Sequence, residues 1–427
     1  MRGAFQEMNL VTASTRPAPI FDPFAPGFTD DPYPQYAALR EDAPVYQHPL
    51  GFWLLTRHED VSALLRAPDV SVESRNVTGP LRDLVEADYR EQPRGGLSML
   101  DRDPPDHTRL RRLVSRAFTS HAVQALRPRI EHLVDGMLDE IARIRHADLV
   151  QALAFPLPFT VIAELLGTPP ADHQRIRELS GTLVRSLEPV SDPGLFAAIV
   201  AARDELAAIA AEMIAWKRRH PANDLLTALI NAEDDGDVLD DQELIAQTLL
   251  LYLAGHETTV NLLAGGTLAL LRNPGQLDVL RRDPGLIPNA VEELLRYDSP
   301  VQVSRRITLR PVSLHGTVLP EGSFILLSLA SANRDRRAFG PDADRVRVSR
   351  ENARQHVSFG GGPHHCLGAS LARLEAEVAF GRMITRLPGL ALDGEVIWNG
   401  RINLRGPARL PVRVAGTSAR DARSAAG

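Results

Sequence analysis

One stretch of the sequence, residues 240–273, predicts an uninterrupted helix long enough to span a whole domain. It begins at the acidic run DDQE, which suits a helix N-terminus, and it ends before Pro274 and Gly275. At about 1.5 Å per residue such a helix measures roughly 45–50 Å, which is close to the width of one domain. We therefore expect it to cross the core, with the remaining elements packed around it.

The rest of the chain is also mainly helical. Helical periodicity recurs at 33–40, 58–66, 107–118, repeatedly between 121 and 231, at 274–282 and at 288–297. Strand character is confined to 51–56, 306–330 and a C-terminal segment, 402–414, that resembles a hairpin, while 71–98 predicts a long loop. The pattern predicts a mainly α protein with small β-sheets.

The composition limits the classes of function. Residues 30–415 are expected to form one domain, between an irregular N-terminal arm at 1–29 and a disordered tail at 416–427. The net charge of -6 gives no support to nucleic-acid binding, and the bases are almost all arginine because Lys217 is the single lysine. No apolar segment approaches the ~20 residues that a bilayer requires. We expect a cytoplasmic monomer without a membrane or nucleic-acid partner.

The most informative short segment is FGGGPHHCLG, residues 359–368, which lies directly before an amphipathic helix. Cys366 is the only cysteine, so no intramolecular disulfide can form. The N-terminus of the following helix is expected to lower the pKa of this thiol, and the glycines allow the backbone to approach a flat ligand. The segment therefore predicts a reactive or ligating thiolate.

Three other interpretations of this segment compete with a ligating thiolate. The cysteine could be inert and buried, or the glycines could simply form a turn that caps a helix. A zinc site could also be built from His356, His364, His365 and Cys366. Zinc is disfavoured because adjacent histidines in an extended loop point to opposite sides.

The spacing F-x-x-G-x-H-x-C-x-G in this segment resembles the haem-binding signature of the cytochrome P-450 monooxygenases, where a cysteine thiolate holds the iron. The resemblance extends over nearly the whole chain and implies the single-domain P-450 fold, with haem b between the long helix and the cysteine loop. It implies Cys366 as the metal ligand. Phe359, Gly360, His364 and Gly368 would be the further cofactor-binding residues of the loop.

The middle of the long helix carries the sequence AGHETT, residues 254–259, which resembles the oxygen-binding groove of the same family. By this resemblance Ala254 and Gly255 leave room over the iron, and Glu257 and Thr258 form an acid-alcohol pair that delivers protons. The alternative is an ordinary buried helix in which a threonine hydroxyl donates back to a carbonyl.

The segment DHTRLRR, residues 106–112, resembles the helix that supplies haem propionate donors in this family, through His107 and Arg111, which share one helix face. By the same resemblance, Arg306 and His364 complete the set of propionate ligands. Nearby Arg109 and Arg116 are expected to be solvated. A further segment, Glu293-x-x-Arg296, resembles the Glu/Arg pair of the family.

The resemblance implies a monooxygenase that takes O2 as co-substrate and inserts one oxygen atom by hydroxylation or epoxidation. Mainly apolar candidate wall residues suggest a bulky lipophilic substrate such as a polyketide, macrolide or terpenoid. The candidate contacts are Leu250, Leu253, Ala254, Val301, Gln302 and Val303. A peroxide-driven peroxygenase and a non-catalytic haem-thiolate sensor are the alternatives, and the Glu257-Thr258 pair favours oxygen activation over both.

The electrons must come from another protein, because the chain shows no Gly-x-Gly-x-x-Gly nucleotide loop and has no room for a reductase domain. By resemblance they come from NAD(P)H through a ferredoxin reductase and a ferredoxin. An acidic ferredoxin would suit a basic patch near Arg112, Arg116 and Arg354.

Overall fold

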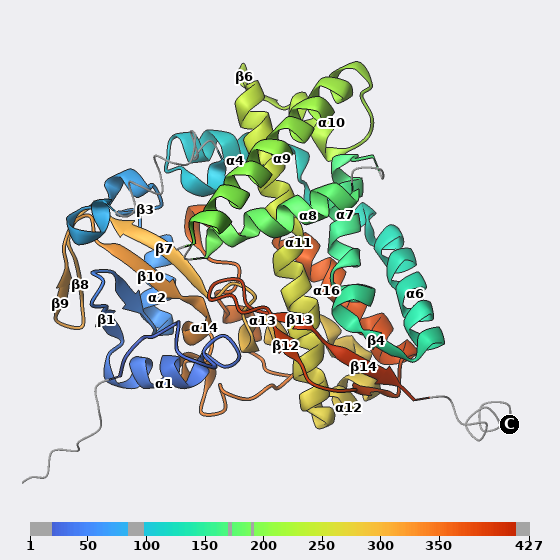
Figure 1. Ribbon diagram of the computed structural model, residues 1–427. Coiled ribbons are helices and arrows are strands. Elements are labelled where there is room, and N and C mark those ends of the chain that lie inside the picture. The colour runs from blue at the N-terminus through green and yellow to red at the C-terminus, as the bar shows by residue number, and fades with distance from the viewer. Residues whose placement is uncertain (1–18, 84–97, 170–172, 189–191, 416–427) are drawn as a thin grey trace, which may run out of the picture.

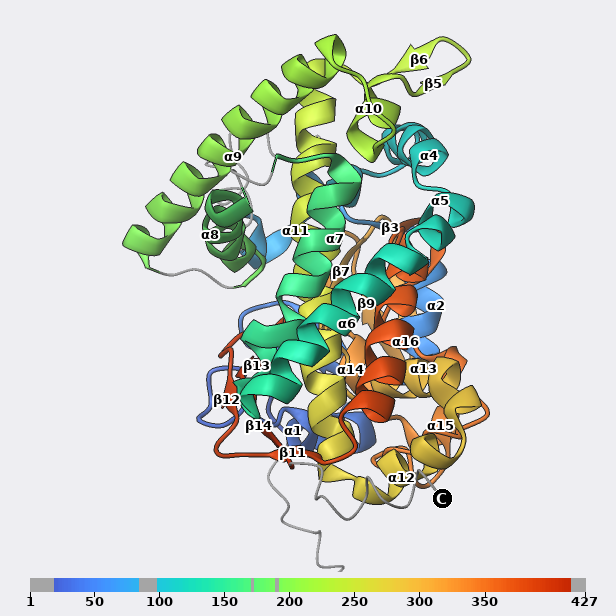
Figure 2. The same cartoon turned by 90° about the vertical axis from the view of Figure 1, so that its right-hand side faces the viewer.

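The computed structural model describes residues 19–83, 98–169, 173–188 and 192–415. A single long helix, α11 (Asp241–Arg272), runs through the middle of the molecule in both views (Figures 1 and 2). Its start is a capping box in which the Asp240 carboxylate accepts the Glu243 N–H (2.8 Å) and the Glu243 carboxylate accepts the Asp240 N–H (3.1 Å). The predicted domain-spanning helix is confirmed.

Most other residues in regular elements of the described ranges are helical, as predicted, because the helices are much longer than the strands. The other α-helices of these ranges are α1 (Tyr33–Asp42), α2 (His58–Arg66), α4 (Asp106–Ala117), α5 (Ser120–Ala125), α6 (Arg127–Ile144), α7 (Pro156–Leu166), α8 (His173–Leu183), α9 (Pro193–Arg219), α10 (Leu225–Ile230), α12 (Pro274–Arg282), α13 (Ile287–Tyr297), α14 (Leu329–Ala332), α15 (Arg336–Phe339) and α16 (Ala369–Arg386). Pro156 and Pro274 each occupy the first turn of their helix, where a missing N–H costs nothing.

The sheets are small, and most lie to one side of α11 or near its lower end, while the β5-β6 pair lies at the top beside α10 (Figure 1). The largest has the strand order β1-β2-β10-β7-β3. Its strands are β1 (Val45–Gln47), β2 (Trp53–Leu55), β10 (Phe324–Ser328), β7 (Val303–Thr308) and β3 (Val70–Ser71). A second sheet has the order β11-β14-β4, from β11 (Leu390–Leu392), β14 (Pro411–Val414) and β4 (His146–Asp148). The two-stranded pairs are β5 (Glu233–Asp234) with β6 (Asp237–Val238), β8 (Val312–Leu314) with β9 (Thr317–Leu319), and β12 (Ile397–Trp398) with β13 (Pro407–Arg409).

The predicted C-terminal hairpin over 402–414 is wrong. Strand β13 pairs with β12, whereas β14 inserts between β11 and β4. Only Leu410 separates β13 from β14, and one residue is too few for the chain reversal that a hairpin needs. The segment therefore continues from one small sheet into the next.

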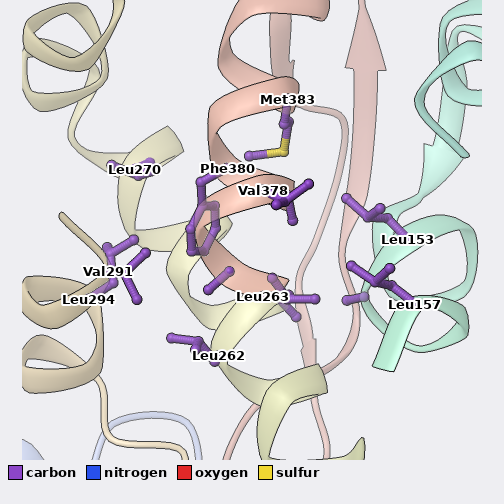
Figure 3. Close-up of a cluster of buried hydrophobic side chains, with 14 of the residues drawn as sticks. Leu153, Leu157, Leu262, Leu263, Leu270, Val291, Leu294, Val378, Phe380 and Met383 are labelled. Carbon is purple, nitrogen blue, oxygen red and sulfur yellow. The ribbon is translucent and has the colours of Figure 1, made fainter. Parts of the chain in front are cut away.

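The largest apolar core lies where α11 packs between α16 and α13 on one side and α7 on the other (Figure 3). Phe380 of α16 fills the centre of this core, close to Leu294 of α13. A Cβ at Gly266 of α11 would lie 2.6 Å from the Phe380 ring, so only glycine leaves room for it. This packing holds the middle of α11 rigidly beside α16, the helix that follows the cysteine loop.

Both ends of the chain extend past the described residues. Within the predicted N-terminal arm, Phe21 and Phe28 are buried against Tyr36 of α1, so this part packs onto the domain. Residues 1–18 and the predicted tail at 416–427 lie outside the described residues, as do residues 84–97 of the predicted long loop. Throughout the described ranges, no helix combines the length and apolar character needed to cross a membrane.

Candidate active site

The cysteine loop is a compact turn that is pressed against the end of α2. The Cys366 N–H donates to the Phe359 carbonyl (2.9 Å), and the Gly360 N–H donates to the Val357 carbonyl (2.8 Å). At Gly362, where φ is +65°, a Cβ would lie 2.5 Å from the Leu65 carbonyl oxygen. Contact with α2 therefore explains this glycine, while a role of Gly360 beside a flat ligand stays a prediction.

The Cys366 thiol lies two residues before Gly368, the N-cap of α16, and is exposed. Although exposed, it is surrounded by enough protein that desolvation raises the pKa of the thiol. The Gly368 N–H, Arg111 and Arg373 act in the opposite direction but do not outweigh this effect. The predicted net lowering of this pKa is therefore wrong for the protein alone, although a coordinated metal cation deprotonates a thiol outright.

The four predicted propionate ligands come together beside the cysteine loop. The rings of His107, from α4, and His364 lie 4.1 Å apart between centroids. Arg111, one turn after His107, donates to the His365 carbonyl (2.7 Å). Burial together with the positive charge of His107, Arg306 and Arg111 lowers the pKa of His364 to about 3. Groups from a helix, a strand and a loop thus share one electropositive site.

No described carboxylate forms an ion pair or a hydrogen bond with these four donors. The charge of Asp103 acts to raise the pKa of His107 and of Arg306, but its oxygens accept hydrogen bonds from Ser71 Oγ and the Val72 N–H instead. His107 is buried, and neither of its ring nitrogens has a hydrogen-bond partner among the described residues. Arg306 is 4% exposed, and its hydrogen bonds run to two neutral oxygens, Ser304 Oγ (3.0 Å) and the Arg305 carbonyl (2.7 Å). Burial lowers the pKa of Arg306 to about 10. Because buried charges require a partner, this chemistry fits a ligand with carboxylates, such as the two propionates of haem.

Thr258 and Gly255 occupy the middle of α11. Thr258 Oγ1 donates to the Ala254 carbonyl (3.1 Å), and Ala254 itself is exposed. A Cβ at Gly255 would lie 3.0 Å from Ile162 Cγ1, so this glycine allows α7 to approach α11. The back-bond of Thr258 is the geometry that the ordinary-helix interpretation also predicts, so a chemical role for Thr258 stays a prediction.

Glu257 is buried in α11 and is held by two basic groups. Arg401 Nη1 lies 2.8 Å from Glu257 Oε2, and His256 Nε2 lies 3.7 Å from Oε1. Burial alone would raise the pKa of this carboxyl, but His256 and Arg401 outweigh burial and lower the pKa to about 2. The carboxylate is therefore ionised at neutral pH and fixed in orientation. Arg401 was not a sequence-predicted site residue, because nothing in its local pattern distinguishes it from a surface arginine.

Comparison with known proteins decides the family. A model of the family "Cytochrome P450" matches residues 189–283 and 285–391. Cytochrome P450 107B1 of Saccharopolyspora erythraea is 43% identical over 91% of this chain and 96% of its own length. The chain belongs to the cytochrome P450 family. The cytochrome P450 monooxygenase PikC of Streptomyces venezuelae is 42% identical, over 94% of this chain and 95% of its own length.

Solved P450 structures confirm the fold. The bacillaene polyketide synthase cytochrome P450 PksS of Bacillus subtilis 168 superposes with a TM-score of 0.84 at 35% identity, covering 93% of this chain and 100% of that one. The predicted single-domain, mainly helical P450 fold with small sheets is therefore confirmed, as is an enzyme of the monooxygenase class. P450 enzymes use haem and O2 with an external supply of electrons.

A buried ion-paired triad ties α13 to the coil at 339–350, which precedes the cysteine loop. Arg296 donates to Glu293 through Nε (2.7 Å) and Nη2 (2.9 Å), and Arg350 Nε lies 3.1 Å from both Glu293 oxygens. All three side chains are fully buried. The sequence predicted the first pair but not Arg350, which lies in irregular coil without a periodic neighbour to indicate its direction.

A second residue that the sequence analysis missed is Arg373 of α16. Its guanidinium lies 4.5 Å from the centroid of the Phe359 ring and 2.8 Å from Glu292 Oε1. The other oxygen of this carboxylate, Glu292 Oε2, lies 2.9 Å from His356 Nε2.

The predicted alternative of a zinc site at His356, His364, His365 and Cys366 is not supported. Among the described residues, these four side chains do not bring three ligand atoms within 4.8 Å of one another.

The predicted substrate contacts divide into two groups. Leu250, Leu253, Val301 and Val303 are partly buried and Ala254 is exposed, which leaves these side chains available to a ligand. Gln302 is different: it is fully buried, and its amide donates to the Ser299 carbonyl (2.6 Å). The structure corrects the prediction for Gln302, whose side chain is enclosed by the protein and does not face a substrate.

The predicted basic patch is partly neutralised. Arg112 and Arg116 both pair with the Asp234 carboxylate, and Arg109, predicted to be solvated, pairs with Glu243. Arg354 is exposed and lies 3.7 Å from Glu292. Two guanidinium groups share one carboxylate at Asp234, so a positive charge remains on this face.

Replacing Arg306 with leucine should lower the haem content of the purified P450 severely. The reason is that removing one donor from a buried charge pair leaves the other charge uncompensated, which typically costs about 3–5 kcal/mol. The haem-to-protein absorbance ratio measures this loss. Arg305→Leu is the matched control, because Arg305 is the next residue along the same strand but is 40% exposed and pairs with Asp101. Equal haem content in the two variants would show that Arg306 does not face the propionates.

Proposed function

We propose that this P450 binds haem b through Cys366 and inserts one atom of O2 into a bulky lipophilic molecule. The reaction consumes O2, two electrons and two protons, and releases the oxygenated product and one water. The observation that carries the proposal is the donor cluster of His107, His364, Arg111 and Arg306, which lies beside the single thiol and pairs with no described carboxylate. Two of its members, His107 and Arg306, are buried.

Each residue of the site has a role that follows from its chemistry. Haem, when bound, supplies a thiolate-ligated iron that activates O2. Cys366 would ligate this iron, and the four donors would neutralise the propionates. Phe359, Gly360 and Gly368 shape the loop around the sulfur, with Arg373 placing a positive charge over the Phe359 ring. The chain's own task is to orient the substrate, exclude water and supply protons.

Proton supply falls to Thr258 and Glu257. The Thr258 hydroxyl donates to the Ala254 carbonyl, so its oxygen lone pairs remain available to accept a hydrogen bond. Glu257 is the adjacent carboxylate, which accepts hydrogen bonds and can order the water through which protons reach a neighbouring hydroxyl. We propose that this acid and this alcohol, which are neighbours in the sequence of α11, act together.

Replacing Thr258 with alanine should uncouple the reaction while haem and substrate still bind. Without the hydroxyl, hydrogen peroxide should rise and oxygenated product should fall, by up to roughly 10²-fold, the range in which a positioned acid-base group acts. Peroxide and product are measured per NAD(P)H consumed.

Thr267→Ala is the matched control for this experiment. Thr267 lies on the same helix and makes the same kind of back-bond, from Oγ1 to the Leu263 carbonyl (2.7 Å). If both variants uncouple equally, Thr258 serves helix packing. Full coupling in Thr258→Ala would contradict the proton-delivery role.

The electrons are proposed to come from NAD(P)H through a ferredoxin reductase and a ferredoxin. An acidic ferredoxin would dock on the face that carries Arg112, Arg116 and Arg354, whose side chains are half or more exposed. Turnover at limiting ferredoxin should then fall as salt rises, because exposed charges are screened over about 10 Å at 0.1 M. Arg112→Gln should weaken this salt dependence, whereas Arg143→Gln, at the far end of α6, should not. Salt-independent turnover would indicate an apolar docking surface.

The proposed substrate class is a polyketide or a comparable lipophilic product. It is supported by the apolar candidate contacts Leu250, Leu253, Val301 and Val303, and by the likeness to the polyketide-synthase P450 PksS. A ligand screen that follows the spin-state shift of the haem absorption band tests this class directly. Polyketides should shift the band at lower concentration than polar molecules of the same size.

A further inference from the structure

The segment 401–404 has no regular secondary structure but is held from several sides. It follows β12 and precedes β13, which pass close to the middle of α11 (Figure 1). The Asn403 carbonyl accepts the Gln302 N–H (2.8 Å), and Asn403 Oδ1 accepts the Val303 N–H (3.2 Å). The Arg401 N–H donates to Asn399 Oδ1 (3.0 Å). This loop is therefore a fixed piece of structure beside the candidate substrate contacts Val301 and Val303.

The strongest hold on the loop is a single carboxylate from a distant part of the chain. Glu188 directly follows the turn of 3-10 helix at Val184–Leu187, after α8. Its Oε2 accepts the N–H groups of Ile402 (2.8 Å) and Asn403 (3.0 Å), and its Oε1 accepts the Leu404 N–H (3.0 Å). Hydrogen bonds to an ionised acceptor are about twice as strong as neutral ones. Three of them on consecutive residues determine the path of the loop backbone.

The same loop carries Arg401, the group that holds Glu257. The Arg401 guanidinium lies 2.8 Å from Glu257 Oε2, and both side chains are nearly buried, at 15% and 11% exposed. The first residue of the loop is thus ion-paired with the central helix, and the backbone N–H groups of the next three residues donate to Glu188. Two carboxylates that are far apart in sequence, Glu188 and Glu257, are joined through four residues.

We propose that Glu188 is a positioning residue for proton delivery. By accepting hydrogen bonds from the backbone of residues 402–404, it keeps the Arg401 guanidinium beside Glu257. This inference rests on the proposed role of Glu257 and adds a residue that acts on it from the α8 side of the active site. Without the hydrogen bonds to Glu188, the loop becomes mobile and Arg401 is displaced. Glu257 then loses its fixed orientation. Since a displacement of about 1 Å can cost roughly 10²-fold in rate, the effect on coupling should be large.

The first test follows the loop itself in the haem-loaded enzyme. Glu188→Ala should speed amide hydrogen exchange at 402–404, because three N–H groups lose their acceptor. Asp148→Ala is the matched control, since Asp148 Oδ1 also accepts a backbone N–H of the C-terminal segment, from Leu410 (2.9 Å), but has no link to Arg401. It should leave exchange at 402–404 unchanged. Unchanged exchange at 402–404 in Glu188→Ala would show that Glu188 does not fix the loop and would overturn the proposal.

The second test separates positioning from a general loss of structure. Glu188→Ala alone should raise peroxide release per NAD(P)H several-fold and up to roughly 10²-fold, whereas in an Arg401→Leu background it should add nothing. In an Arg401→Lys background, where a cation remains, Glu188→Ala should again raise peroxide release. A further increase on top of Arg401→Leu would show that Glu188 acts by another route and would overturn the proposal.

The two hypotheses fail in different ways. If Glu257→Gln and Arg401→Leu both keep the parent coupling and oxygen turnover, the proposed role of Glu257 is wrong. If Glu257→Gln slows oxygen turnover and Arg401→Leu uncouples, but Glu188→Ala has no effect, only the positioning role of Glu188 is wrong.

Discussion

Replacing Cys366 with serine should remove the thiolate spectrum and abolish monooxygenase turnover. In the reduced protein with carbon monoxide, a thiolate ligand gives the red-shifted Soret band of the P450 family. A serine hydroxyl has no comparable electron donation, so the band should move to a shorter wavelength or disappear with the haem. Absorption spectra of the reduced carbon monoxide adduct measure this, at matched protein concentration.

His365→Gln is the control that separates the two neighbouring ligand candidates. His365 is adjacent to Cys366 in the loop and is exposed, and histidine is the other common haem ligand. The band should survive His365→Gln and should not survive Cys366→Ser. The reverse result would assign the iron to His365. Because Cys366 is the only cysteine, a thiol reagent provides an independent check: haem should protect one thiol per chain.

Replacing Glu293 with glutamine should destabilise the protein more than any surface change. Glu293 balances two fully buried guanidinium groups, those of Arg296 and Arg350. Arg350 would still pair with Asp342 (2.9 Å), but Arg296 pairs with no other described carboxylate. Breaking a buried ion pair costs about 3–5 kcal/mol because a charge is left without compensation. A cost of this size is a large share of a typical unfolding free energy of about 5–15 kcal/mol. We expect little folded protein, measured by thermal melting and by haem content.

The Arg143 and Glu140 pair offers a matched comparison for this triad. It has the same spacing of three residues along a helix, but its side chains are 71% and 54% exposed. Glu140→Gln should leave melting nearly unchanged, because exposed ion pairs contribute little. If Glu293→Gln itself barely folds, Arg350→Lys provides a milder variant that keeps the charge and loses the planar fork. Normal melting in both triad variants would contradict the structural role.

The sequence alone predicted those features that are written locally along the chain. The helix at 241–272 has its caps, its period and its proline stop in adjacent residues, so its length and its central position followed. The cysteine loop and the i,i+4 pair of His107 and Arg111 are also local patterns. Spacing within one element is fixed by covalent geometry, which is why such motifs remain visible without a structure.

The tertiary structure alone decided which distant residues meet. Arg350 completes the Glu293 triad, Arg401 pairs with Glu257 from 144 residues away, and Glu188 reaches the backbone of 402–404. In each case the decisive partner lies in a distant segment of the chain, so no periodicity within one element could reveal it. The thiol pKa and the C-terminal strands were mispredicted for the same reason. Burial and strand pairing depend on what the rest of the chain places around a segment, and that is determined only when the whole core packs.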